Sequence, residues 1–142
     1  MKLKIWLFLI LFLIILGLAG YGYFKATPKA ENQENIPRVE IGPKSFDFGE
    51  INFGDVVSYD FKVKNSGDKI LEIKRIATSC PCASAKIEKE IIEPGEEVNL
   101  FVSYDSGAMG AHGKGEQERI IYVRSNDPIN PQVEVVIYAT VK

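Results

Sequence analysis

The chain has 142 residues, enough for one domain of ordinary size and an appendage but not for a second hydrophobic core. Its 46% hydrophobic and 25% charged residues match an average globular protein, although the apolar residues are concentrated near the N-terminus. Beyond Thr27 there are 14 basic and 19 acidic residues, a net charge of −5 without a basic cluster. This balance argues against nucleic acid as a partner.

The N-terminal segment predicts a membrane anchor. No charged residue occurs from Ile5 to Phe24, a run that as a helix would span about 30 Å, the thickness of the hydrocarbon core of a bilayer. Lys2 and Lys4 precede this run, so the positive-inside rule keeps the N-terminus in the cytoplasm and exports the rest. We therefore expect a single-pass signal-anchor or transmembrane helix over residues 1–26. A cleavable signal peptide is the alternative, and it would leave the domain secreted rather than tethered.

A short linker is expected next. Residues 27–37 read TPKAENQENIP and contain one large aliphatic residue, Ile36, among Pro, Glu, Asn and Gln. Such a segment buries too little apolar surface to offset the entropy lost on ordering. We expect a flexible connection to a domain that covers residues 38–142.

The hydrophobic period in this domain is two, which is typical of strands. Residues 57, 59, 61 and 63 are apolar and alternate with polar neighbours, so one face of a strand would be buried. Asn65-Ser66-Gly67-Asp68 follows with a turn composition, and residues 70–76 are again strand-like. We expect these two strands to form a hairpin.

Further strands follow at short intervals. Residues 87–92 precede the turn signal Pro94-Gly95, and residues 98–104 alternate with Phe101 as the one misfit. The last run, residues 133–141, is apolar on both faces, which suits an interior strand. Two N-terminal strands and one more before the last run complete the set, at residues 39–41, 45–48 and 120–123. Seven or eight strands without a useful helical period predict an all-β fold, an immunoglobulin-like antiparallel β-sandwich, with a small closed barrel as the alternative.

Cys80 and Cys82 are the only cysteines and lie in the sequence Ser79-Cys80-Pro81-Cys82-Ala83. In an extended segment the side chains at i and i+2 point to the same side, so both thiols face one spot. An exported pair is expected to oxidise, which makes a disulfide or redox pair one interpretation. A Cu(I) or Zn site completed by Met109 and His112 is the second. The third is a pair of small buried residues without a chemical role.

The segment from Asp105 to Gly115 holds four glycines and the single histidine, His112. We interpret it as a flexible loop, because no helix start follows to supply a phosphate site. Ser/His/Asp catalysis needs a base held by an orienting partner, and His112 lies among glycines. The acidic residues at 93, 96 and 97 crowd a turn, where solvated charge is the ordinary explanation. We therefore predict no catalytic residue, no cofactor and no enzymatic activity.

The sequence contains FDFGEI at 46–51 with Gly54 after it, FKVKNSG at 61–67, LEI at 71–73, the SCxC pattern at 79–82, Pro94-Gly95 and SNDP at 125–128. Together these motifs resemble a bacterial family of exported domains of unknown function, which is distantly similar to the Hydin and major-sperm-protein group. The resemblance covers about residues 44–140 and implies an immunoglobulin-like sandwich in an extracytoplasmic place, with no catalytic activity. Members of that family commonly carry Gly between the two cysteines and Thr after them, where this chain has Pro81 and Ala83.

These observations predict a membrane-tethered, extracytoplasmic domain that acts as a non-enzymatic binding or structural module. Its expected partner is a protein or another component of the cell envelope, bound on a sheet face, on a sheet edge or at the loop 105–117. The alternative function is thiol–disulfide or copper handling by Cys80 and Cys82, with Met109 and His112 as possible further ligands.

Overall fold

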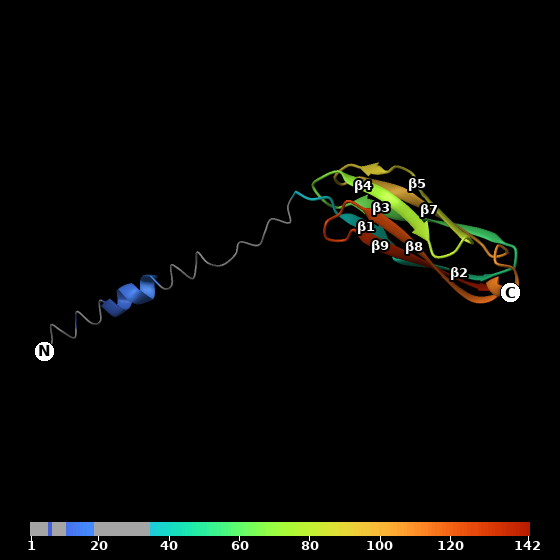
Figure 1. Ribbon diagram of the computed structural model, residues 1–142, viewed down its shortest axis with the longest axis horizontal. Coiled ribbons are helices and arrows are strands. Elements are labelled where there is room, and N and C mark those ends of the chain that lie inside the picture. The colour runs from blue at the N-terminus through green and yellow to red at the C-terminus, as the bar shows by residue number, and fades with distance from the viewer. Residues whose placement is uncertain (1–5, 7–10, 19–34) are drawn as a thin grey trace. The chain divides into compact units, whose positions relative to one another are not determined.

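The computed structural model describes residue 6, residues 11–18 and residues 35–142 (Figure 1). Residues 11–18 are helical. Among the described residues, no helix is both long enough and apolar enough to cross a membrane. Most of the expected anchor, residues 1–26, and of the expected linker, residues 27–37, lies outside the described residues, so both stay predictions.

Residues 35–142 form nine strands and one short 3₁₀ helix. The strand content is set by the period of two, because each strand offers one apolar face for burial. The elements in chain order are β1 (Val39–Gly42), β2 (Ser45–Ile51), β3 (Val56–Asn65), β4 (Leu71–Thr78), β5 (Ala83–Ile87), β6 (Ile91–Ile92), β7 (Glu97–Asp105), η1 (Gly110–Gly113), β8 (Gly115–Ser125) and β9 (Gln132–Val141).

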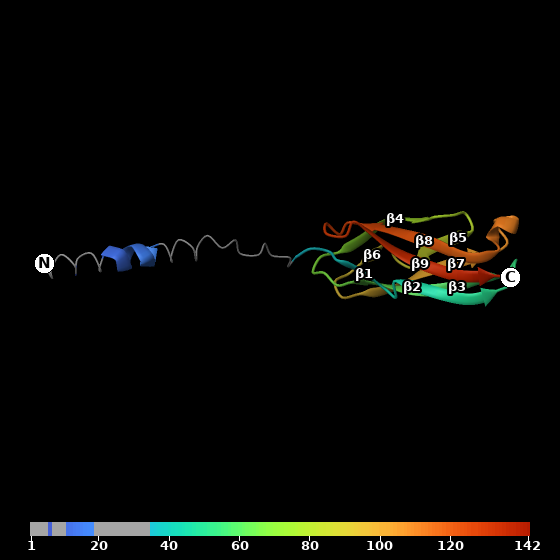
Figure 2. The same ribbon diagram turned by 90° about the horizontal axis from the view of Figure 1, so that it is seen from below.

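The strands form two sheets packed face to face, which confirms the all-β sandwich and rules out the closed barrel. One sheet has the order β1-β3-β7-β5 and the other the order β2-β9-β8-β4-β6. Figures 1 and 2 show the two layers from perpendicular directions. The core between them is built from inward side chains of both sheets, with Phe61, Leu71, Leu100, Ile121 and Val135 each at 0% exposure.

One strand pair departs from the expected antiparallel arrangement. β2 pairs with β9 in parallel, whereas the other strand pairs are antiparallel. β1 ends at Gly42 and β2 begins at Ser45 in the opposite sheet. Two linking residues step from one sheet to the other without reversing the chain, so β2 runs in the direction of β1.

The alternation expected for residues 57–63 and 98–104 is confirmed. In β7, Val98, Leu100, Val102 and Tyr104 are buried at 6% exposure or less, while their neighbours are more exposed. The misfit Phe101 is 42% exposed, because it lies on the outer face between Asp60 of β3 and Lys86 of β5. An outward aromatic residue therefore leaves the register of the strand unchanged.

The expected hairpin of residues 57–76 is wrong. β3 and β4 belong to different sheets, so the segment between them crosses from one layer to the other. Asn65 is fully buried at the end of β3, and its Nδ2 donates to the carbonyl oxygens of Lys69 at 2.7 Å and Ile92 at 2.9 Å. Its Oδ1 accepts from the amide of Gly67 at 3.0 Å. The Asn65 side chain therefore supplies hydrogen-bond partners to backbone groups that have no hairpin partner strand, including those of Gly67 and Lys69 in the crossing.

The strand expected over residues 87–92 is also wrong. The structure divides this run into β5, which ends at Ile87, and the two-residue β6, Ile91–Ile92, in the other sheet. Glu88, Lys89 and Glu90 between them are exposed. These three charged residues interrupt the apolar run, and the division raises the strand count to nine from the seven or eight expected.

Asp127, in the loop between β8 and β9, holds the first residue of β1 by a hydrogen bond. It is 1% exposed, and its carboxylate accepts from the backbone amides of Val39 at 2.9 Å, Ile129 at 2.8 Å and Asn130 at 3.1 Å. Burial is the largest influence on the pKa of Asp127 and acts to raise it. The amide hydrogen bonds and the charge of Arg38 act in the opposite direction, and the net effect lowers the pKa of Asp127.

Candidate functional site

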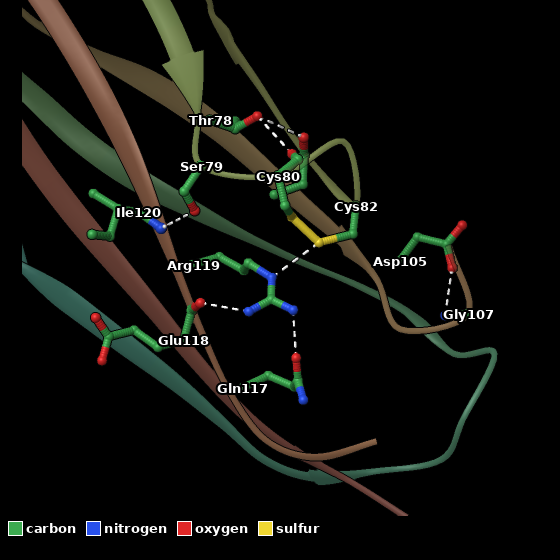
Figure 3. Close-up of a disulfide and its surroundings, with 11 residues drawn as sticks. Thr78, Ser79, Cys80, Cys82, Asp105, Gly107, Gln117, Glu118, Arg119 and Ile120 are labelled. Atoms are coloured by element: carbon green, nitrogen blue, oxygen red, sulfur yellow. Dashed lines mark hydrogen bonds between the residues drawn. A yellow bond between two sulfur atoms is a disulfide. The ribbon is translucent and has the colours of Figure 1, made fainter. Parts of the chain in front are cut away.

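A disulfide joins Cys80 and Cys82 in the connection between β4 and β5, with the two Cα atoms 5.2 Å apart (Figure 3). β4 belongs to one sheet and β5 to the other, so the disulfide lies where the chain crosses between the layers. The two side chains do converge on one spot. A redox role of the pair stays a prediction.

The backbone around the disulfide is held on both sides. Ser79 exchanges two hydrogen bonds with Ile120 of β8, from its amide to the carbonyl at 2.9 Å and from the Ile120 amide to the Ser79 hydroxyl at 3.0 Å. On the other side the carbonyl of Cys82 accepts from the amide of Asp105 at 2.9 Å. The Thr78 hydroxyl lies 2.9 Å from the carbonyl oxygen of Cys80. The segment is therefore positioned by both sheets independently of the S–S bond.

The two sulfur-bearing residues differ in access to solvent. Cys82 is 3% exposed and belongs to the core cluster, whereas Cys80 is partly buried at the margin of that cluster. Pro81 between them is exposed. A reagent arriving from solvent therefore meets Cys80 first.

Arg119 of β8 is the one charged side chain bonded to the disulfide among the described residues. Its Nε lies 3.0 Å from Sγ of Cys82, and Figure 3 shows the guanidinium directed at this sulfur. Nη1 donates to the carbonyl oxygen of Glu118 at 2.6 Å, and Nη2 donates to Oε1 of Gln117. The guanidinium also lies 5.8 Å from the ring centre of Tyr104, within the range of a cation–π contact. Four contacts thus fix its orientation.

Sequence reasoning missed Arg119, although a signal was present. Ile121 and Val123 of β8 point into the core, and Arg119 has the same parity, so the period of two places a cation on the inward face. Charged residues are almost never buried without a partner. An inward arginine at the end of a strand therefore indicates a specific acceptor, which here includes a sulfur atom.

Tyr104 lies beneath this arginine at the end of β7 and is 2% exposed. Burial raises the pKa of Tyr104, and the positive charge of Arg119 acts against that increase. The neighbouring Asp105 adds to it. The phenol therefore stays neutral at physiological pH, and its ring offers the guanidinium a flat aromatic surface.

Met109 and His112 lie after β7, next to and within the short helix η1. Both side chains are exposed. Within the described residues, no group of three or more His, Cys, Asp or Glu side chains is arranged to hold a metal ion. Because both sulfur atoms are engaged in the disulfide, metal binding by Cys80 and Cys82 would first require reduction of the pair.

A second candidate surface is the outer face of the sheet that contains β8 and β9. Ile120 and Val136 are paired in register there and are half-buried, and Tyr138 is 40% exposed. At one end a depression of about 290 Å³ is lined by Arg75 and Arg124, which are cross-strand neighbours. At the other end a depression of about 450 Å³ is lined in part by three acidic side chains, Asp47, Glu116 and Glu118. The face therefore has an apolar centre between an arginine pair and an acidic cluster, with the exposed Glu134 of β9 beside the arginine end.

Comparison with known families identifies the chain. The family model described as a protein of unknown function, DUF1573, matches residues 39–141. The chain belongs to this family. No curated protein matches the sequence. The assignment confirms the expected membership in a family of unknown function. Export of the domain and the roles of the individual motifs stay predictions.

Solved structures show the same fold. A protein of unknown function from Porphyromonas gingivalis superposes with a TM-score of 0.68 at 22% identity, over 81% of this chain and 51% of that one. This DUF1573 chain therefore spans about half the length of that protein. The PapD-like domain 7 of human CEP192 gives 0.57 at 12% identity, over 80% and 92%. SSP-19 of Caenorhabditis elegans, described as an MSP-domain protein like family member, gives 0.50 at 16% identity, over 70% and 97%. The immunoglobulin-like sandwich is thus shared with the PapD-like and MSP domains.

Proposed function

We propose that this DUF1573 chain is a membrane-tethered, extracytoplasmic and non-enzymatic binding module that docks a protein on the outer face of β8 and β9. The tether is supported by the charge-free run from Ile5 to Phe24. The observation that carries the docking surface is the apolar band of Ile120, Val136 and Tyr138 between a basic and an acidic end.

Charge complementarity favours a protein as the occupant. Arg75 and Arg124 lie side by side with like charge, and neither forms an ion pair with any residue of the segment 35–142. A polymer of one charge would meet repulsion at one of the two ends of the face. A folded protein presents both signs and an apolar centre, so it matches an acidic patch to Arg124 and a basic patch to Glu118.

Site-specific photo-crosslinking in cells tests this surface. A photoreactive residue at Val136 is expected to capture a protein of defined mass, whereas one at Phe101 on the opposite face is not. Arg124→Glu should abolish the adduct because it reverses the charge at the basic end, and Lys62→Glu on the opposite face serves as the matched control. Equal adducts from both faces, or an adduct unaffected by Arg124→Glu, would contradict the assignment.

The tether has a separate test. A reporter fused after Lys142 is expected to be inaccessible to cytoplasmic labelling and to remain with the membrane after alkaline extraction. Release of the domain into the soluble fraction would show that the N-terminal segment is cleaved.

Thiol–disulfide exchange is a second candidate function, favoured by one specific observation. The sulfur of Cys82 accepts a hydrogen bond from a permanently charged arginine, and a cation beside a thiol stabilises the thiolate form. The full-length chain would be equilibrated with mixtures of reduced and oxidised glutathione, and its free thiols counted without denaturant. Retention of the disulfide until the domain unfolds would refute this function.

A further inference from the structure

We propose that disulfide exchange in this chain is directional: an incoming thiolate attacks Cys80, and Cys82 leaves as a thiolate held by Arg119. The inference rests on the second candidate function above. It assigns different roles to the two cysteines and a positioning role to an arginine that no sequence motif marks.

Access decides which sulfur is attacked. Cys82 is 3% exposed and packs within the core cluster, while Cys80 lies at the margin of that cluster. Thiol–disulfide exchange requires the attacking sulfur to reach its target directly, so the buried sulfur is shielded. Attack at Cys80 leaves Cys82 as the departing group.

Arg119 stabilises the charge that appears on that departing group. Its Nε already points at Sγ of Cys82 from 3.0 Å, where a neutral disulfide sulfur is only a weak acceptor. When the S–S bond breaks, the sulfur gains a full negative charge and the same contact becomes a charge-assisted hydrogen bond. The interaction is therefore stronger after bond cleavage than before it. This difference is what lowers the barrier to attack.

The guanidinium is held in place before reaction. Glu118 and Gln117 occupy two of its nitrogens, and the ring of Tyr104 lies beneath it. All three partners belong to strands, so the donor does not need to reorient when the charge develops. The position at the margin of the core also reduces screening by water.

The chemistry balances with a dithiol as the reaction partner. Its first thiolate attacks Sγ of Cys80 and forms a mixed disulfide, and the electron pair of the S–S bond passes to Sγ of Cys82. The second thiolate of the partner then attacks the partner's own sulfur in the mixed disulfide and releases Cys80 as a thiolate. Two electrons pass from the partner dithiol, which becomes a disulfide, to the cysteine pair, and each new thiolate takes up a proton as the pH dictates.

The reverse reaction is supported by the surrounding backbone. The hydrogen bonds of Ser79 to Ile120 and of Asp105 to Cys82 do not involve the sulfur atoms. Reduction leaves them in place, so the two thiols stay side by side and can be reoxidised. The pair is therefore a reversible carrier of two electrons.

Single-cysteine variants of the full-length chain test the direction. Cys82→Ser leaves Cys80 as the only thiol, and Cys80→Ser leaves Cys82. We expect the first to form a mixed disulfide with oxidised glutathione at least several-fold faster than the second. Equal rates, or faster reaction of the Cys80→Ser variant, would overturn the assignment of Cys80 as the attacked position.

Arg119 variants test the positioning role. Arg119→Met removes the charge and the donor and should slow reduction by dithiothreitol roughly 3- to 10-fold, because exchange rates depend on the stability of the leaving thiolate. Arg119→Lys should recover part of that loss. In the reduced chain, the rise of thiolate ultraviolet absorbance should move to higher pH in Arg119→Met, a shift that a purely structural role would not produce. Lys62→Met, which removes an exposed cation from β3 of the opposite sheet, is the matched control.

The outcomes separate this inference from the function beneath it. Thermal melting of each variant confirms that the rates refer to folded chains. Normal reduction of the parent chain with no effect of Arg119→Met would overturn the role of the arginine and leave exchange standing. A disulfide in the folded parent chain that resists dithiothreitol would overturn both.

Discussion

The Asp127→Asn substitution tests how strongly one buried carboxylate holds the first strand. Asn retains one acceptor oxygen, which can serve the amides of Ile129 and Asn130, but its amide nitrogen would face the amide of Val39. A hydrogen bond to a charged acceptor contributes about 1.5–3 kcal/mol, compared with about 1 kcal/mol for a neutral one. Loss of one such bond and weakening of two gives about 3 kcal/mol of destabilisation. For a domain of this size the melting temperature should fall by about 12–24 °C.

The penalty should also depend on pH, with a definite sign. The pKa of Asp127 is lowered in the folded state, so its contribution is complete above the ordinary pKa of an aspartate. That contribution is lost as the pH falls from there through the lowered pKa of the folded state. The difference between parent and variant, measured by urea unfolding, should therefore shrink in acid. Substitution of the exposed Asp60 by Asn is the control. The reasoning would be refuted if Asp127→Asn cost less than about 1 kcal/mol, or if its cost did not change on acidification and equalled that of Asp60→Asn.

Four further substitutions probe the crossing, the core and the outer face of β7. Asn65→Asp places a carboxylate oxygen against two backbone carbonyls and should cost about 2–4 kcal/mol in urea unfolding, less in acid where the protonated group can donate. Gly67→Ala should lower the melting temperature measurably, because the new Cβ would clash with the carbonyl oxygen of Ile36. An unchanged melting temperature would contradict this close approach. Leu100→Ala should lower the free energy of unfolding by about 2–5 kcal/mol, because Leu100 is 0% exposed. The neighbouring Phe101→Ala should lower it by less than about 1 kcal/mol, because Phe101 is 42% exposed. Similar losses for both would contradict the register of β7.

The sequence was sufficient to predict the buried face of the regularly alternating strands, because burial in a sandwich imposes a period of two. Val98, Leu100 and Val102 all point inward as their spacing predicted, and a polar–apolar pattern of this regularity fits no other local structure. The same logic correctly placed the last strand, β9, in the interior of its sheet, between β2 and β8. Local pattern therefore predicts which face of a strand is buried.

The pattern could not assign strands to sheets. A turn composition such as Asn65 to Asp68 fits both a hairpin and a crossing between layers, and the difference depends on contacts with residues distant in the sequence. Here the deciding contact joins Asn65 to Ile92, 27 residues away. Arg119 was missed for a related reason, because its acceptor lies 37 residues earlier in the chain. Such partners become visible only when the strands are placed in space.

The segments that carry the family resemblance are of two kinds: in some, buried polar side chains hold the fold together, whereas in the cysteine segment the sulfur atoms do not. Asn65 and Asp127 lie in such segments, and their buried polar atoms are all hydrogen-bonded within the domain; no buried side-chain nitrogen or oxygen in the described residues lacks a partner. Groups that are already satisfied have nothing left to offer a ligand. The pair Cys80 and Cys82 is different, since its loop is held by backbone bonds and does not need the sulfur atoms for its position. A structural explanation that accounts for Asn65 and Asp127 therefore leaves the disulfide unexplained. The unexplained disulfide is therefore the reason to test thiol–disulfide exchange at Cys80 and the part of Arg119 in it.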